Sequence, residues 1–392
     1  MILQNADIVS FAAGFPRPPR LLALGEPMHG SEEVLQARNA VVEDLVLRGG
    51  YRSVALESDL HAAPLVDEYI AGGDIDLDRA LAEGVSHGFG AARATRELIE
   101  RLREINSTLT TPVRFYGFDG PLETAAAPSP RAFLLRLRAV LAEVAEFLPA
   151  SAEQIDDLVG DEAHWTQPQA MYHADCSIGC SANAQRLRLV ADDLRAVLEA
   201  NAPLLASSSD LWWWARADAR TAVGLLRYHS MMATDGPDRF GRLIAQRDVM
   251  MGQNLLAIVD REAGRGGTVA FAHNRHLQRE RSGMQMGPYQ LGWFGGGAQA
   301  QVRLGEGYRF VAMDIGAAPA HGLAVPEAGT VEGELYRTQS TNARLYRGGE
   351  LAERLHGAAT RADRDARGAY FPLEAEHLAD TDGVLFLREV RA

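Results

Sequence analysis

The sequence contains no lysine, because all 39 of its basic side chains are arginines. This excludes Schiff-base chemistry on a lysine and the phosphate-binding lysine of P-loop enzymes. Only two cysteines occur, Cys176 and Cys180, separated by three residues. With His173 they allow two interpretations: a small metal or redox site, or two free thiols on a helix.

Long apolar runs are missing as well. No run reaches the roughly eighteen apolar residues that a membrane-spanning helix needs, so we expect no membrane span. The segment Met1–Ser10 lacks the basic and apolar regions of a signal peptide, and we therefore expect a cytoplasmic protein. With 52 acidic against 39 basic residues the net charge is −13. This disfavours nucleic acid as a partner, since phosphate binding needs a dense basic surface.

The remaining composition is that of a large globular protein. The chain has 392 residues, of which 47% are hydrophobic and 23% charged. A chain of this length can bury a large core and forms two or three structural units, or one unit with insertions.

Short apolar strands alternate with amphipathic helices in the first 120 residues. The strand–helix–strand pattern over residues 21–57 is typical of a βαβ unit with parallel strands. We expect strands at 21–25, 53–57, 113–118, 268–272 and 310–315, and helices at 31–48, 93–105 and 240–261. Between them, residues 133–148, 182–205 and 210–232 show only helical patterns.

These elements predict an α/β protein with a central, mainly parallel sheet flanked by helices and an inserted helical lobe. We expect residues 1–120 to form the first part of the α/β core and 121–236 the helical lobe. Residues 237–392 are expected to form the second part of the core and a C-terminal tail.

Ionisable residues follow four of the expected strands. Because parallel strands end at one edge of a sheet, where ligands bind, these side chains are expected to converge into an active site. They are Glu26 and His29, then Glu57, then Asp119, and finally His273 and His276.

The residue types suit ester hydrolysis by an activated water molecule. Histidine is the side chain whose ordinary pKa suits a base near neutral pH, and Glu26 or Glu57 would orient the imidazole of His29. Arg38 and a second histidine would stabilise the oxyanion. A serine-nucleophile hydrolase is disfavoured because no Gly-x-Ser-x-Gly elbow occurs.

Structural roles are the alternatives for the same side chains. His29 could cap the following helix, and Glu57 could form an ion pair with Arg38 or Arg52. Asp119 could be a turn former or a substrate-binding residue. One of the two histidines after the 268–272 strand is expected to be structural, with His273 kept as the catalytic one.

The main alternative to acid–base catalysis is that the same side chains bind a divalent metal ion. Carboxylates and imidazoles are acceptable zinc or manganese ligands. The ligand set would be Glu26, His29, Glu57 and His273, with His276 as a further candidate. No His-Glu-x-x-His helix occurs, so we expect no cofactor and leave a metal open as a possibility.

Several motifs, in order along the chain, resemble the erythromycin esterase family. They are Gly25-Glu26-Pro27-Met28-His29-Gly30, Arg38, Leu56-Glu57-Ser58-Asp59, Arg247-Asp248 with Asn254, and Ala272-His273-Asn274-Arg275-His276. Characterised members hydrolyse the lactone ester of macrolide antibiotics and have an α/β core with a helical lobe. The resemblance implies that His29 is the general base. It also implies that Glu26, Glu57 and His273 complete the catalytic centre, supported by Arg38 and His276.

Three bulky residues are candidates for the wall of a substrate cleft. Met28 stands where many family members carry a small polar residue, and Phe89 where the resemblance suggests tryptophan. Trp213 belongs to the run Trp212–Trp214, whose side chains point about 100° apart on a helix and cannot all face one core. Either the run is buried on several sides, or one ring faces the substrate.

The sequence therefore predicts a hydrolase that cleaves a carboxylic ester of a bulky, apolar natural product, for example a macrolactone. A first alternative is a biosynthetic enzyme on the same scaffold, such as a cyclase, dehydratase or acyl transferase. A second is a protein that binds a small molecule without converting it.

Overall fold

The structure is a computed structural model. It describes residues 7–123, 126–365, 368 and 370–391. The expectation of no signal peptide rests on the segment Met1–Ser10, and the first six residues of this segment lie outside the described residues. The chain divides into two compact units. The first comprises the described residues up to Phe118 together with Leu255–Gly283 and those from Phe294 onward, and the second comprises Asp119–Asn254 and Met284–Trp293.

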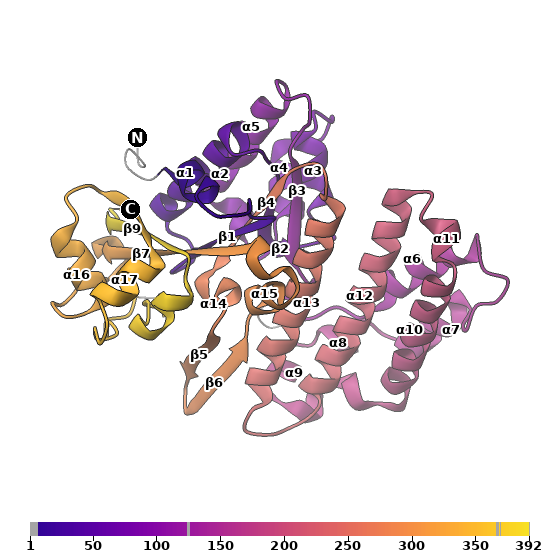
Figure 1. Ribbon diagram of the computed structural model, residues 1–392. Coiled ribbons are helices and arrows are strands. Elements are labelled where there is room, and N and C mark those ends of the chain that lie inside the picture. Colours follow the sequence, from indigo (N-terminus) through magenta and orange to yellow (C-terminus); the bar gives the residue numbers. More distant parts are fainter. Residues whose placement is uncertain (1–6, 124–125, 366–367, 369, 392) are drawn as a thin grey trace. The chain divides into compact units, whose positions relative to one another are not determined.

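The first unit is built on a seven-stranded sheet with the order β3-β2-β4-β1-β7-β9-β8 (Figure 1). The pairs β1–β4, β1–β7, β2–β4 and β7–β9 are parallel, and only β8 is antiparallel to its partner β9 among the pairs described. The strands, including the separate β5–β6 pair, are β1 (Leu21–Glu26), β2 (Tyr51–Asp59), β3 (Arg114–Asp119), β4 (Gly267–His273), β5 (Arg281–Met286), β6 (Tyr289–Phe294), β7 (Tyr308–Ala317), β8 (Ala343–Arg347) and β9 (Gly383–Glu389).

Helices cover the sheet, which confirms the predicted α/β class with a mainly parallel sheet. Those of the first unit are α1 (Ile8–Ala13), α2 (Glu32–Arg48), α3 (Pro64–Ile70), α4 (Leu77–Gly84), α5 (Arg93–Asn106), α14 (Asn274–Leu277), α15 (Gly296–Leu304), α16 (Val331–Thr338) and α17 (Gly348–Arg354). Two further strands, β8 and β9, lie in the C-terminal part, where the sequence analysis placed only a tail.

Alternating side chains of the strands form the core. Leu22 and Leu24 of β1 pack with α2 and α5 in one large apolar cluster. In β9, Leu385 belongs to that cluster, whereas Val384 and Phe386 pack with α16 and α17 in another. This period of two is the expected pattern for a sheet covered on both faces.

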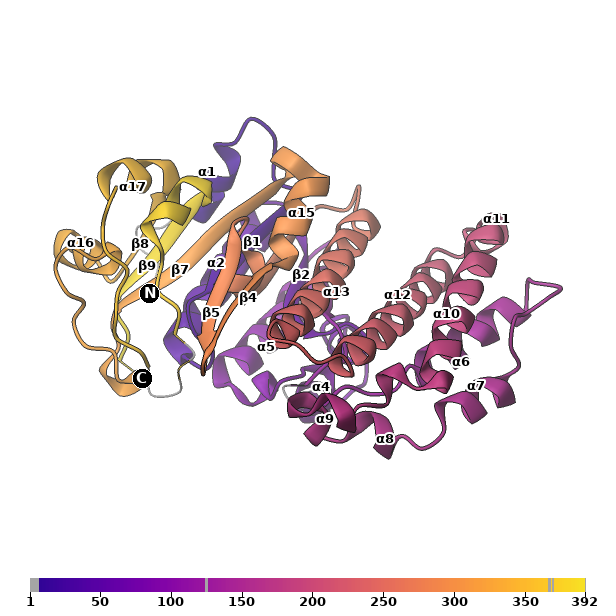
Figure 2. The ribbon, with the colours of Figure 1, turned by 90° about the horizontal axis from the view of Figure 1, so that it is seen from below.

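The second unit is helical apart from its part of the β5–β6 pair. Its helices α6, α10 and α12 pack against one another and lie side by side in both views (Figures 1 and 2). The helices are α6 (Arg131–Ala142), α7 (Ala152–Val159), α8 (Ala163–Thr166), α9 (Gln169–Tyr172), α10 (Ala182–Ala200), α11 (Ala202–Leu205), α12 (Ser209–Met232) and α13 (Arg239–Arg261). The boundary between the units falls within α13.

Two of the expected helices end earlier than predicted. The helix expected over 133–148 ends at Ala142, and Phe147 beyond it is exposed. The helix expected over 182–205 is interrupted at Asn201, because Pro203 cannot donate the backbone bond that would continue the first helix. No described helix combines the length and the apolar character needed to cross a bilayer.

Candidate active site

Three neighbouring parallel strands of the first unit end in ionisable residues. The strand order is β2-β4-β1, and the register pairs Glu26 with His273 and Leu56 with Phe271. Glu57, directly after Leu56, therefore lies beside the end of β4. Glu26, Glu57 and His273 are buried, so side chains from distant parts of the chain meet at the predicted edge of the sheet.

His29 lies in the loop after β1 and is bonded to Glu26. Its Nδ1 is 2.7 Å from Glu26 Oε1, and the loop turns at Gly30, whose left-handed φ of 79° suits a residue without a Cβ. Ser31, and not His29, occupies the N-cap position of α2. The His29 side chain remains one-third exposed, at 33%. A buried carboxylate on Nδ1 favours the tautomer in which Nε2 can accept a proton, and it stabilises the charged imidazolium.

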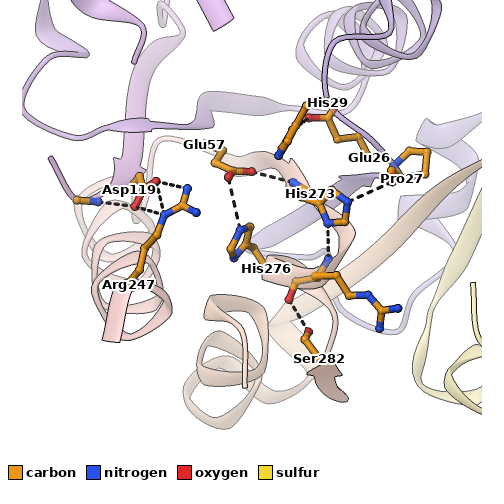
Figure 3. Close-up of polar contacts among 11 residues, drawn as sticks. Glu26, Pro27, His29, Glu57, Asp119, Arg247, His273, His276 and Ser282 are labelled. Carbon is orange, nitrogen blue, oxygen red and sulfur yellow. Dashed lines mark hydrogen bonds and ion pairs between the residues drawn. The ribbon is translucent and has the colours of Figure 1, made fainter. Parts of the chain in front are cut away.

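Glu57 is held by the end of β4. Its Oε2 accepts a bond of 2.9 Å from the backbone N–H of His273, and its Oε1 lies 3.5 Å from His276 Nε2. The alternative partner Arg52 donates instead to the backbone carbonyls of Val46 and Tyr51. The Glu57 carboxylate is therefore fixed by two residues of the His273–His276 segment (Figure 3).

Both ring nitrogens of His273 are engaged with backbone groups. Its Nε2 lies 3.1 Å from the Pro27 carbonyl oxygen, which makes it the donor, and its Nδ1 accepts a bond from the Arg275 N–H at 3.1 Å. Burial, followed by the nearby imidazoles of His29 and His276, holds the pKa of His273 well below its usual range. This ring is a neutral, fixed group and is poorly suited to be a base.

The rings of His29 and His273 lie next to each other, with centroids 5.3 Å apart. Figure 3 shows the His29 imidazole pointing towards the Glu57 carboxylate and the backbone of His273. Phe89 also packs against His29, at 5.0 Å between ring centroids. The base candidate is thus held by Glu26 and contacted by two other rings.

Arg38 is a buried cation on α2. One edge of its guanidinium is bound by Asn39 Oδ1, at 3.0 Å from Nε and 2.9 Å from Nη2, and by the Ala94 carbonyl oxygen at 3.3 Å. It also lies over the Phe271 ring, 5.0 Å from its centroid. Burial lowers the pKa of Arg38 to about 10, opposed by the charge of Glu26. Arg38 therefore stays charged at neutral pH.

A cavity of about 460 Å³ in the first unit brings these groups together. Its volume lies in the range of small-molecule sites. The charged part of its lining is formed by Glu26, His29, Glu32, Arg38 and Glu57, and the apolar part by Leu35, Leu56, Val85, Phe89 and Phe271. A polar floor beside an apolar wall suits a ligand that carries one reactive polar group on an apolar body.

His87 also lines this cavity, and the sequence analysis did not identify it. It is the only described residue other than glycine with a positive φ, at 59°, a conformation that is uncommon for such residues and concentrates at functional sites. Ser86 fixes its position, because the Ser86 hydroxyl accepts a bond from the Asp59 N–H and the Ser86 N–H donates to Ser58 Oγ, both at 2.9 Å. A His-Gly pair is a weak turn signal, so no sequence pattern pointed to this residue.

Three other predicted site residues are not among those that line this cavity. Met28 is only 1% exposed and packs in the apolar core, so the expectation that it lines the cleft is wrong, because its thioether side chain turns inward. Asp119 is completely buried in the second unit, where its carboxylate binds the Arg247 guanidinium, with 2.9 Å between Nε and Oδ2. Trp213 is buried in the same unit, edge-on to Trp214 at 4.6 Å. A substrate-binding role for Asp119 or Trp213 stays a prediction.

The geometry does not favour Glu26, His29, Glu57 and His273, the ligands considered for the case that a metal is present, as a metal site. Both His273 nitrogens already bond to backbone groups. Within the described ranges, the residues that bring three ligand atoms within 4.8 Å of one another are Glu374, Glu376 and His377. Cys176 and Cys180 form no disulfide, and they lie in two separate short 3₁₀ turns, Ala174–Cys176 and Ile178–Cys180, instead of on one helix as expected.

Solved structures with a similar fold cover almost the whole chain. A protein from Bacillus cereus is 17% identical, with a TM-score of 0.70 over 95% of this chain and 88% of that one. A mutant of the erythromycin esterase EreC in its open conformation is 19% identical, with a TM-score of 0.67 over 95% and 91%. A succinoglycan biosynthesis protein is 17% identical, with a TM-score of 0.62 over 95% and 88%. At these identities the likeness concerns the fold.

No curated protein sequence is a significant match to the chain. A family model does match: the model described as erythromycin esterase covers residues 46–390. The matched range includes Glu57, His273 and His276 and begins after Glu26, His29 and Arg38. Because it spans most of the chain, it confirms the resemblance inferred from the motifs, and the protein belongs to the erythromycin esterase family.

Proposed function

We propose that the protein is an esterase that hydrolyses a carboxylic ester with a water molecule activated by His29. Membership of the erythromycin esterase family supports a hydrolase of this type. The observation that carries the proposal is the 2.7 Å contact between His29 Nδ1 and Glu26 Oε1 at the wall of a cavity. A histidine oriented by a buried carboxylate is the usual arrangement for a general base.

The reaction begins when His29 Nε2 takes a proton from water while the water oxygen bonds to the ester carbonyl carbon. Glu26 stabilises the resulting imidazolium. Glu57, a fixed carboxylate on the same cavity, accepts the second hydrogen bond of the water. The carbonyl oxygen becomes an oxyanion, and the buried guanidinium of Arg38 supplies positive charge for it.

The intermediate then collapses. The bond between the carbonyl carbon and the alcohol oxygen breaks, and the leaving alkoxide takes the proton back from His29 as an alcohol. A linear ester gives an acid and an alcohol, whereas a lactone gives one ring-opened hydroxy acid. His273 and His276 do not transfer protons in this scheme but hold Glu57 in place. No metal ion is needed, because a charged arginine is available to stabilise the oxyanion.

The proposed substrate is an apolar natural product that carries one ester group, for example a macrolactone. The charged floor of the cavity suits the ester, and its wall of Leu35, Val85 and Phe89 suits an apolar body.

The test is incubation with aryl esters and macrolactones in ¹⁸O-labelled water, read by mass spectrometry. One labelled oxygen should enter the acid product. His29→Ala should lower kcat about 10²- to 10⁴-fold, whereas His356→Ala, which alters an exposed histidine of the same unit, should not. A product rearranged without uptake of water would instead identify a cyclase or dehydratase. A rate that stays flat from about pH 5 to about pH 8 would rule out a histidine base.

A further inference from the structure

Two buried carboxyl groups lie outside the cavity lining, in the part of the first unit formed by β7 and α16. Asp314 of β7 and Glu332 of α16 are both completely buried, and their side chains hydrogen-bond one another. In each group one oxygen, Asp314 Oδ2 or Glu332 Oε2, has no hydrogen-bond partner as long as both carboxyl groups are ionised. Carboxylate oxygens accept hydrogen bonds and do not donate them.

One proton accounts for both unpartnered oxygens. If Glu332 carries it, Oε2–H donates to Asp314 Oδ2 and both atoms are satisfied. Burial, followed by the charge of Asp314, raises the pKa of Glu332 well above its usual range, and burial also raises the pKa of Asp314. Two like charges in one dry site are costly, so we expect the pair to share one proton and to carry a single negative charge.

The shared proton anchors the segment 370–374, which we call the strap, at two points. The Tyr370 hydroxyl donates to Asp314 Oδ1 at 3.0 Å and lies 3.5 Å from Glu332 Oε1. The Leu373 N–H donates to the same Glu332 oxygen at 3.1 Å. Phe371 lies between these two anchor residues.

Phe371 connects the strap to the site. Its N–H donates to the Pro27 carbonyl oxygen at 3.0 Å, the same atom that accepts the His273 Nε2–H. Its ring stands edge-on to the His273 ring at 5.1 Å. Glu374 at the end of the strap binds the Arg275 guanidinium at 2.7 Å. The strap therefore packs against the ring of His273, the residue whose backbone N–H holds Glu57, and binds the neighbouring Arg275.

We propose that Glu332 is a positioning residue: the proton that it shares with Asp314 keeps the strap against His273, and loss of this proton at alkaline pH releases it. Once the proton is gone, two adjacent buried carboxylates repel each other and the Tyr370 hydroxyl cannot satisfy both. The other charged groups that face the pair do not remove this repulsion. Arg361 donates to the carbonyl groups of Ile315 and Gly316 and is itself paired with Asp363.

The sign of the pH effect follows from linkage. A carboxyl group whose pKa is higher in the folded than in the unfolded state binds a proton on folding, so its contribution to stability falls as pH rises from the unfolded pKa through the folded one. The strap should therefore be held at acid and neutral pH and released on the alkaline side.

The test compares the wild type with Glu332→Gln and with the control Glu353→Gln, which alters an exposed glutamate of α17. The glutamine keeps the shape of protonated glutamate, because its amide donates to Asp314 and its oxygen accepts from Leu373. Hydrogen exchange of the Phe371 and Leu373 amides is measured against pH and divided by the intrinsic rate. Protection should fall about tenfold per pH unit above the pKa of the pair in the wild type and in the control, and it should stay constant in Glu332→Gln.

The effect on catalysis rests on the proposed function. The alkaline decline of kcat should follow the loss of protection in the wild type and disappear in Glu332→Gln, while activity at neutral pH stays unchanged. Equal pH dependence of exchange in the two proteins would overturn the inference. If no ester is cleaved by either protein but exchange behaves as expected, the proposed function fails and the positioning device stands. Tyr370→Phe, which removes one anchor without changing the charge, should speed exchange at all pH values.

Discussion

Two pairs of buried carboxylates in the first unit differ in what surrounds them. Glu26 and Glu57 are each 4% exposed and face a cavity, with histidines as their partners. Asp314 and Glu332 are 0% exposed and bond mainly to each other and to Tyr370. Carboxyl groups therefore occur in one unit both in the lining of a cavity that can hold a substrate and in the closed interior.

The difference shows how partners decide the role of a buried acid. An imidazole or guanidinium beside a carboxylate keeps it charged and leaves it able to orient a base. A second carboxyl group makes one of the two neutral, and the shared proton then acts as a structural bond. Exposure alone does not separate the two pairs, since both are almost completely buried.

Glu26→Gln should give the largest effect, on activity. The amide cannot stabilise a charged imidazole and can donate to Nδ1, which places the wrong tautomer at the site, so kcat should fall about 10²- to 10⁴-fold. The free energy of unfolding should be unchanged or higher, since a buried charge is removed. Steady-state kinetics and urea denaturation measure the two quantities. A large loss of stability would make Glu26 a structural residue like Asp314 and remove the contrast between the pairs.

Asp314→Ala should show the opposite pattern. The substitution leaves the Glu332 carboxyl, the Tyr370 hydroxyl and the Ile315 N–H without their bonds, and the free energy of unfolding should fall by about 2–4 kcal/mol. Urea denaturation at neutral pH, with the exposed substitution Glu353→Ala as control, measures the change. An effect below about 0.5 kcal/mol, the range of ordinary surface substitutions, would contradict a tightly bonded pair.

Phe89→Ala should have the smallest effect, on substrate affinity. The change removes an apolar part of the cavity wall and one flank of the His29 ring. One lost apolar contact is worth about 1–3 kcal/mol, so KM should rise about 10- to 100-fold, with a smaller change in kcat. Phe147→Ala, at an exposed position of the second unit, is the control. A fall in kcat alone would show that Phe89 orients His29 and does not bind substrate.

Five of the seven strands of the sheet were predictable because their sequences carry a strong and local signal, whereas β8 and β9 were not predicted. The runs at 21–25 and 268–272 are short, apolar and bounded by glycine or proline, and they became β1 and β4 with at most one residue added at either end. Their parallel arrangement followed from the helices between them, and it brought Glu26, Glu57 and His273 to one edge. This part of the site needed only the period of the sequence and the rule for parallel strands.

Contacts that depend on long-range packing were not predictable. Nothing in the local sequence shows that Tyr370 reaches Asp314, that Met28 turns into the core, or that His87 adopts a left-handed conformation. The contacts that fix the His273 ring were not predictable either, because they come from the backbone of Pro27 and Arg275. Such bonds depend on how separate loops pack together, and a shift of one residue in either loop would change them.

The loop between β1 and α2 has a consequence for folding. Pro27 contacts residues 273 and 371, and Glu32 at the start of α2 accepts the backbone N–H bonds of Arg93 and Ala94. Contacts so far apart in sequence require large chain loops to close first, which slows their formation. A ribosome-bound chain that has not yet emerged beyond Phe371 therefore lacks the bond from Phe371 to Pro27, so this loop is held by fewer contacts until the strap has been synthesised.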